Sequence, residues 1–258
     1  MTFNYKNSDY KELDRIENYI YKEVRKHGTL CFPLVDSENF SKNTSLMVQR
    51  FEKIGASAIL VGGSSVTDQI ELTELISSIK LQIKIPVILF PGNVTGVSPK
   101  ADAILFSSLL NSENPYFITE AQALGALAIE KYQIEALPTA YLIIGEGTTA
   151  WFIGHARGIP FNKIGIAVMY SLAAQYLGMR FLYLEAGSGA TQNVSPQMIS
   201  AVRKHYKGTL IVGGGIRTPE IAKEMAEAGA DIIVIGSMFE TEKNWEDLLS
   251  SIIMAIRK

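Results

Sequence analysis

The sequence has very little cysteine and histidine. Its single cysteine, Cys31, excludes an internal disulfide and fits a reducing cytoplasm, and because it lies in the apolar run TLCFPLV we interpret it as a core thiol. The three histidines, His27, His155 and His205, are scattered along the chain. Zinc and iron sites usually draw on clustered His and Cys ligands, so these residues give no indication of such a site.

The sequence also lacks long hydrophobic runs and an excess of charge of either sign. No run approaches the roughly 20 apolar residues of a membrane helix, and the polar start MTFNYKNSDYKELDR does not resemble a signal peptide. The 24 basic and 26 acidic residues give a net charge of −2, too small for a broad field that attracts nucleic acid or an anionic membrane. We therefore expect a soluble, cytoplasmic protein with no membrane span and no nucleic-acid partner, which binds any anionic ligand locally.

Short apolar runs alternate with longer amphipathic segments, which is typical of repeated βα units. Eight runs are strand candidates, at 29–35, 57–63, 86–92, 102–110, 139–145, 181–187, 209–215 and 231–237. They are apolar on both faces, as parallel strands covered by helices are, and their number predicts a closed (β/α)8 barrel of the TIM type rather than an open doubly wound sheet. No linker or shift in composition divides the chain, so we expect residues 1–258 to form one domain.

Two connections depart from this alternation. The segment NVTGVSPKA, between the third and fourth runs, is too short for a crossover helix. One outer helix is therefore expected to be missing, which would leave a lateral opening for a long hydrophobic ligand unless a neighbouring helix or a second subunit covers the loop. The segment EGTTAWFIGHARGIPF, from Glu146, is longer than a usual βα loop and could be a lid, in which Trp151 and Phe152 either cap a substrate or pack on the barrel rim.

Chemistry in such barrels lies on the loops that follow the carboxyl ends of the strands. After the seventh run, GGGIRTPE offers Thr218 as a helix N-cap and Pro219 as the first helical residue. Glycine lets a ligand approach the backbone, and N–H groups at a helix start attract anions, so we predict a phosphate cradle between this loop and the Gly236-Ser237 pair after the eighth run. The triple glycine does not match the dinucleotide-binding pattern GxGxxG.

Two carboxylates stand at the ends of strand candidates. Glu185, in YLEAGSGA, is the candidate general base because partial burial would raise its pKa, although a capping acid or an ion-pair partner is the structural alternative. Ser188 and Thr191 follow as possible hydrogen-bond donors. Asp36 is a candidate Mg²⁺ ligand with Ser64 from the next loop, or else an N-cap of the following helix.

Six segments, in order along the chain, together resemble the geranylgeranylglyceryl phosphate synthases, in the second of their two sequence groups. These segments are VGGSS (61–65), SLLNSENPYFI (108–118), PTAYLIIGEG (138–147), YLEAGSGA (183–190), IVGGGIRTPE (211–220) and IGSMFE (235–240). The resemblance implies a modified (β/α)8 barrel that lacks its third helix and has an extra N-terminal helix. It also implies a Mg²⁺-dependent prenyltransferase of ether-lipid biosynthesis, which joins geranylgeranyl diphosphate to the 3-hydroxyl of sn-glycerol 1-phosphate and works as a homo-oligomer, a dimer or a hexamer.

The resemblance also implies roles for individual residues. Asp36 and Ser64 match the metal-binding pair, and Glu185 matches the acid near the attacking hydroxyl. The positions that match the glycerol phosphate site are Tyr183, Leu184, Glu185, Ala186, Gly187, Ser188, Gly189, Gly214, Gly215, Gly236 and Ser237. The lipid product further suggests an apolar groove near the missing helix, with Tyr116, Phe117 and Tyr141 as candidate lining residues.

One loop departs from the family pattern. Ser37 and Asn39 stand where the family commonly has proline and lysine, which puts the diphosphate contacts of this loop in doubt, and Lys42 is a possible substitute for the missing charge. Two other functions therefore stay open at this point. One is a different phosphate-binding barrel enzyme acting on a soluble sugar phosphate, and the other is a barrel that binds a prenyl or phosphate ligand without turnover.

Overall fold

Eight parallel strands close into a barrel in sequence order, and β8 pairs back with β1. The computed structural model describes residues 15–36, 42–63, 68–188, 190 and 192–258. The strands are β1 (Leu30–Asp36), β2 (Ile59–Gly63), β3 (Val87–Pro91), β4 (Ala103–Leu109), β5 (Glu135–Ile143), β6 (Phe181–Glu185), β7 (Thr209–Gly213) and β8 (Ile232–Ile235). The predicted closed (β/α)8 barrel is confirmed.

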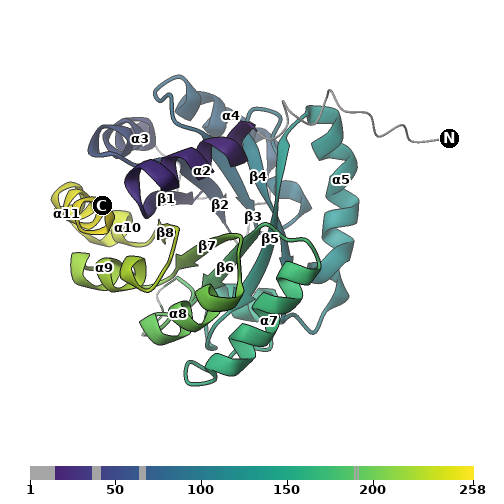
Figure 1. Cartoon of the computed structure of the whole chain (residues 1–258). Coiled ribbons are helices and arrows are strands. Elements are labelled where there is room, and N and C mark those ends of the chain that lie inside the picture. Colours follow the sequence, from purple (N-terminus) through teal and green to yellow (C-terminus); the bar gives the residue numbers. More distant parts are fainter. Residues whose placement is uncertain (1–14, 37–41, 64–67, 189, 191) are drawn as a thin grey trace.

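Helices surround the barrel on its outer side (Figure 1). They are α2 (Arg15–His27), α3 (Lys42–Ile54), α4 (Gln69–Lys80), α5 (Ala121–Tyr132), α6 (Thr149–Ile153), α7 (Ile164–Tyr176), α8 (Pro196–His205), α9 (Pro219–Glu227), α10 (Met238–Thr241) and α11 (Trp245–Ile256). A π-helical turn, η3 (Tyr116–Glu120), precedes α5. Within the described part of the chain, no helix combines the length and the apolar character that a bilayer span needs.

Both faces of the strands are buried, which explains why the strand sequences are apolar without interruption. Alternate residues such as Phe32 and Leu105 fill the barrel interior. Their neighbours, such as Cys31 and Ile104, point outward into the layer between strands and helices. Burial raises the pKa of the Cys31 thiol to about 12, so the thiol stays neutral and Cys31 is a core residue, as predicted.

Helix α2 lies across one end of the barrel, where the strands begin (Figure 1). Its side chains Ile16 and Ile20 pack into the barrel interior. The carboxylate of Glu135, the first residue of β5, accepts hydrogen bonds from the backbone N–H groups of Ile16 and Glu17 at 2.7 and 2.8 Å. These charge-assisted bonds satisfy N–H groups in the first turn of α2, so the extra N-terminal helix closes the end of the barrel opposite the strand-end loops.

The connection from β3 to β4 contains only a short 3-10 turn, η2 (Val94–Gly96), where the other connections carry a helix. All of this connection is described, so the predicted loss of one outer helix is confirmed. The neighbouring helices on either side are α4 and α5 (Figure 1). The largest difference from the predicted strand bounds is the start of β5, which begins at Glu135 rather than Thr139 because its ladder with β4 includes Pro138, the register partner of Phe106. The other strand ends differ from the prediction by at most two residues.

Candidate active site

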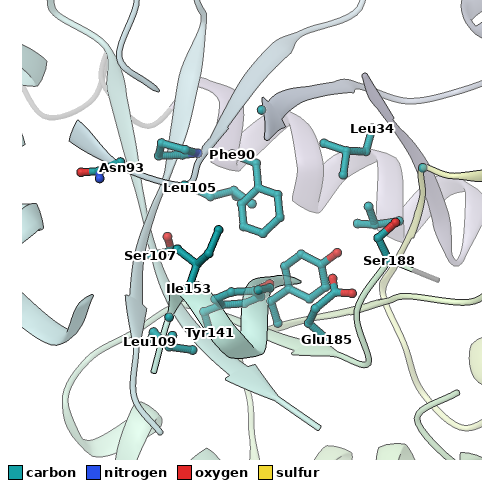
Figure 2. Close-up of a pocket in the computed structure, with 18 of the residues that line it drawn as sticks. Leu34, Phe90, Asn93, Leu105, Ser107, Leu109, Tyr141, Ile153, Glu185 and Ser188 are labelled. Atoms are coloured by element: carbon teal, nitrogen blue, oxygen red, sulfur yellow. The ribbon is translucent and has the colours of Figure 1, made fainter. Parts of the chain in front are cut away.

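A single pocket joins two chemically different regions. Its polar part lies at the strand-end loops and is lined by Asp36, Glu185, Gly187, Ser188, Gly214, Gly215, Gly236 and Ser237. Its apolar part reaches the gap left by the missing helix, where Val94, Val97, Phe106, Ala121, Gly125 and Ile129 line it. Figure 2 shows Glu185 and Ser188 on one side of the pocket and Asn93 on the other, with Phe90 between them. The pocket thus suits a ligand that is charged at one end and apolar along the rest.

Glu185 is the last residue of β6, and it is buried at 7% exposure. Strand register places it beside Ile143 of β5 and Gly213 of β7. Its Oε1 accepts the backbone N–H of Gly187 at 2.6 Å, and the carboxylate also accepts a hydrogen bond from the Tyr183 hydroxyl. Burial raises the pKa of Glu185, whereas the hydrogen bonds from Tyr183 and Gly187 act in the opposite direction. A proton acceptor with a raised pKa therefore faces the pocket.

The loops after β6 and β7 are in close contact. Gly187 and Gly214 have φ angles of 99° and 88°, in the left-handed region that favours glycine. A Cβ atom on Gly214 would lie 2.5 Å from the Gly187 nitrogen and 2.7 Å from Oε1 of Glu185, so only glycine fits there. Asn193 Nδ2 donates to the Gly214 carbonyl at 2.9 Å. These contacts hold the glycine backbone next to the carboxylate.

The helix start predicted after the triple glycine is confirmed. Thr218 is the N-cap of α9 and its hydroxyl accepts the Ile221 N–H at 3.3 Å, with Pro219 as the first helical residue. Gly214, Gly215, Gly236 and Ser237 all line the pocket. Because the cradle combines glycine backbone from two adjacent strand ends, it has the geometry in which barrels of this type bind phosphate.

The residues predicted to bind glycerol phosphate from Tyr183 onward lie in two places: some line the pocket, and others are buried between the strands and the helices. Tyr183, Glu185, Gly187 and Ser188 line the pocket. Leu184 and Ala186 are buried in the layer between strands and helices and are not among the lining residues, because successive side chains of a strand point to opposite faces. Gly189 and Thr191 lie outside the described residues.

Asp36, the last residue of β1, lines the pocket and is the candidate metal ligand that the structure describes. Mg²⁺ is commonly bound by one or two carboxylates together with water and substrate phosphate oxygens, so a single carboxylate in a ligand pocket fits it. Across the described ranges, no three His, Cys, Asp or Glu side chains form a metal-binding group. Ser64, Ser37 and Asn39 and the side chain of Lys42 lie outside the described residues.

The apolar part of the pocket follows α5. Gly125 is buried in this helix, yet a Cβ atom built on it meets no heavy atom within 4 Å, so this position faces open space. Of the predicted lining residues, Phe117 and Tyr141 line the pocket, whereas Tyr116 does not. Instead, the Tyr116 hydroxyl donates to Asn93 Oδ1 at 2.6 Å, across the gap between η3 and the β3–β4 connection.

The long segment after β5 lines the rim of the pocket, but not through Trp151 and Phe152, the two aromatic residues suggested by the sequence. Ala150 and Ile153 of α6 line the pocket. Trp151 packs against the small cluster of Leu109, Ile143 and Ala156, and Phe152 is exposed to solvent. The packing alternative therefore holds for Trp151, and neither aromatic side chain lines the pocket.

Sequence reasoning missed Phe90 of β3 and Gly125 of α5 as pocket residues. The signal for Gly125 was present, because a glycine inside the helical segment AQALGALAIEKY weakens a helix and calls for a packing or functional reason. The sequence gives no comparable indication for Phe90, since an aromatic residue in an apolar strand is normally expected to be a core residue.

Fold and site together define a class of closed parallel barrels with a pocket that suits an anionic group at the strand ends and an apolar chain at its side. A model of the PcrB family matches residues 31–256. The chain is 60% identical over 228 residues to geranylgeranylglyceryl phosphate synthase of Nitrosopumilus maritimus (strain SCM1), covering 88% of this chain and 91% of that protein. It is 62% identical over 226 residues to the synthase of Cenarchaeum symbiosum (strain A), covering 87% and 92%.

A solved structure of the same family supports this similarity. The crystal structure of (S)-3-O-geranylgeranylglyceryl phosphate synthase from Thermoplasma acidophilum, in complex with its substrate sn-glycerol-1-phosphate, superposes with a TM-score of 0.89 at 38% identity, covering 94% of this chain and 98% of that one. This chain belongs to the PcrB family, together with the geranylgeranylglyceryl phosphate synthases.

Proposed function

We propose that this protein transfers the geranylgeranyl group of geranylgeranyl diphosphate to the 3-hydroxyl of sn-glycerol 1-phosphate, releasing diphosphate in the biosynthesis of ether lipids. The observation that carries this proposal is the continuity of the pocket from the glycine cradle and Glu185 to the open side of α5. A soluble sugar phosphate would occupy only the polar part of this pocket and leave the apolar part empty. A long prenyl diphosphate and a small phosphate ester would together occupy both parts.

The chain's own residues account for the steps of this reaction. The backbone around Gly214, Gly215 and Gly236 binds the phosphate of glycerol phosphate and orients its free hydroxyl, which reduces the entropic part of the barrier. Glu185 accepts the proton of that hydroxyl as the oxygen attacks the first prenyl carbon, because a carboxylate with a raised pKa is a stronger base. The prenyl chain lies along α5, where Gly125 leaves room for it.

Asp36 would hold Mg²⁺ together with diphosphate oxygens. The ion, when bound, would supply positive charge that favours departure of the diphosphate. Asp36 fits this role because its carboxylate is a hard oxygen donor that faces the pocket.

Asp36→Asn is expected to raise the Mg²⁺ concentration required for half-maximal diphosphate release by at least about tenfold, because a neutral amide binds a hard cation less well than a carboxylate. Titration of Mg²⁺ at saturating substrates measures this shift, and Asp68→Asn, at the exposed N-cap of α4, is the control. An unchanged Mg²⁺ requirement in Asp36→Asn would move the metal site to other residues.

The function is tested by measuring diphosphate release with geranylgeranyl diphosphate and Mg²⁺, in parallel with sn-glycerol 1-phosphate and with the 3-phosphate enantiomer. Release that occurs with the 1-phosphate alone, stops on chelation and yields an extractable prenyl product is the expected result. Absence of release with either enantiomer, across several prenyl lengths and with folded protein, would overturn the proposal.

We also propose that two copies associate through the outer faces of α5 and α7. The exposed side chains on these faces are Leu124 and Leu127 on α5 and Ile166, Met169, Tyr176 and Leu177 on and just after α7. They repeat at helical spacing on consecutive full-length helices of the outer layer (Figure 1), and apolar surface of this kind is typical of a protein interface.

The double variant Met169→Lys/Leu177→Lys is expected to lower the mass of the particle in solution to that of a smaller assembly, because it introduces unpaired charge into this face. Light scattering after size-exclusion chromatography measures the mass. The matched control, Leu81→Lys/Met254→Lys, changes comparably exposed residues just after α4 and on α11 and should leave the mass unchanged. A particle of wild-type mass in the first variant would contradict this interface.

A further inference from the structure

Three aromatic rings meet where the polar and apolar parts of the pocket join. They belong to Phe90 of β3, Tyr141 of β5 and Tyr183 of β6. The ring centroids are 5.4 Å apart for Phe90 and Tyr141, and 5.3 Å apart for each of the other two pairs. All three residues line the pocket, with Phe90 and Tyr141 partly exposed and Tyr183 buried at 1% exposure. We call these three residues the aromatic triad.

The barrel holds the aromatic triad in place. Tyr141 and Tyr183 are direct register partners in the β5–β6 ladder. Gly213 provides the space for the Tyr183 hydroxyl, since a Cβ atom on Gly213 would lie 2.3 Å from that oxygen. On the opposite side, a Cβ atom on Gly62 would lie 1.9 Å from the Phe90 carbonyl, so the glycine lets β2 and β3 approach closely. The rings therefore form a fixed surface of the pocket.

A buried carboxylate, that of Glu185, lies next to the aromatic triad. The Tyr183 hydroxyl donates to the buried carboxylate of Glu185. Burial and then the charge of Glu185 raise the pKa of both Tyr141 and Tyr183 well above the usual value, so the phenols stay neutral and cannot act as anionic bases. The neutral rings present faces whose quadrupole attracts cations.

We propose that the aromatic triad stabilises the positive charge that develops on the first carbon of the allylic diphosphate during transfer. In this step the bond between that carbon and the diphosphate oxygen breaks, and its electron pair leaves with the diphosphate. The glycerol hydroxyl oxygen supplies the pair for the new carbon–oxygen bond, and its proton goes to Glu185. This inference rests on the proposed function, since it concerns the same reaction.

The position of the triad supports this role. The reacting carbon must lie near Glu185, while the chain attached to it must extend toward α5. Phe90 lies between these two regions in Figure 2. Cation–π attraction acts within about 6 Å of a ring centroid and is strongest where water is excluded. A cation at the junction would meet the partly exposed rings of Phe90 and Tyr141 first.

The alternative is that the rings only form the apolar floor of the pocket. Substitutions that keep shape and change ring electronics separate the two roles. Phe90 is replaced by 4-fluoro-, 3,5-difluoro- and 3,4,5-trifluorophenylalanine, which progressively weaken the negative ring face, and by cyclohexylalanine, which removes it. The same series at Phe106, which also lines the apolar part of the pocket but is not in the triad, is the control.

The single-turnover rate of prenyl transfer is expected to fall stepwise with the number of fluorines at Phe90, reaching about tenfold for the trifluoro or cyclohexyl variant, while KM for glycerol phosphate stays within about twofold. Binding of a prenyl ammonium compound in the presence of diphosphate, measured by calorimetry, should weaken in parallel, whereas binding of its neutral carbon analogue should not change. The Phe106 series should show no trend with fluorination.

A rate and an ammonium affinity that do not vary along the Phe90 series would overturn the inference and leave a packing role. That outcome is distinct from failure of the proposed function, in which the unsubstituted protein itself would release no diphosphate. Ammonium binding is measured without turnover, so a loss that follows ring electronics would support a cation site at Phe90 independently of the rate.

Discussion

Glu185→Gln is expected to lower the turnover of prenyl transfer by about 10²- to 10⁴-fold, the range for loss of a general base. The glutamine keeps an oxygen that can accept the Gly187 N–H, so the loop after β6 should keep its conformation. KM for glycerol phosphate should therefore change much less than kcat. Equal losses in turnover and in glycerol phosphate binding would show that Glu185 acts chiefly in binding. Glu224→Gln, on the exposed side of α9, is the control.

The same substitution is expected to stabilise the folded protein at neutral pH. Burial raises the pKa of Glu185 above its unfolded value, so folding favours the protonated carboxyl, and this stabilising contribution is lost as pH rises through the folded pKa. A neutral glutamine avoids the cost of the buried charge. The difference in Tm between variant and wild type should be largest at neutral pH and vanish below the usual carboxyl pKa. A destabilised variant at pH 7 would contradict this.

The raised pKa of Glu185 also predicts the shape of the activity profile. A general base must be deprotonated, so kcat should fall as pH decreases through the raised pKa, at a higher pH than for an ordinary exposed carboxyl. Measurement of kcat against pH at saturating substrates and Mg²⁺ checks this limb. If the residual activity of Glu185→Gln no longer falls at low pH, the fall seen in the wild type is caused by protonation of Glu185.

Gly125→Phe is expected to abolish transfer of the 20-carbon geranylgeranyl group while retaining transfer from a shorter prenyl diphosphate. The side chain would occupy the open space beside α5 that the prenyl chain needs. Rates with donors of 10, 15 and 20 carbons, measured for Gly125→Ala, Gly125→Leu and Gly125→Phe, should show the accepted length decreasing as the side chain grows.

Two controls accompany the Gly125 series. Gly125→Ala should keep full transfer and stabilise the protein by about 0.5–1 kcal/mol, because alanine favours the helix and meets no neighbour here. Glu130→Phe puts the same ring on an exposed position of α5 and should leave length preference unchanged. Equal loss of transfer at all donor lengths in Gly125→Phe would show that the groove beside α5 does not hold the prenyl chain.

Much of the fold was predictable from sequence because burial on both faces of a parallel strand leaves a continuous apolar run. The missing helix followed from the length of the β3–β4 connection, and the cradle followed from glycines before Thr218. The predicted start of β5 at Thr139 is wrong, because the ladder with β4 runs through Pro138 and reaches back to Glu135.

The candidate site was only partly predictable. Glu185 and the glycines are visible in sequence because polar and small residues at the end of an apolar run have no purpose in a core. The contact of Phe90 and Tyr141 with Tyr183 could not be predicted, since the sequence does not distinguish inward-facing aromatic residues that fill a core from those that line a pocket. The contact of Glu135 with the start of α2 joins residues 118 and 119 positions apart, which no local pattern encodes.

The sequence by itself determined the eight strands, the absent helix, the glycine loops and the carboxylate at the end of β6, because each of these depends on local spacing and side-chain type. The tertiary structure decided which of these residues share one pocket. Barrel closure and strand register bring β3, β5 and β6 together at the aromatic triad. The rotation of α5 about its axis directs Gly125 toward the gap, and such long-range geometry depends on packing across the whole barrel rather than on neighbours in the chain.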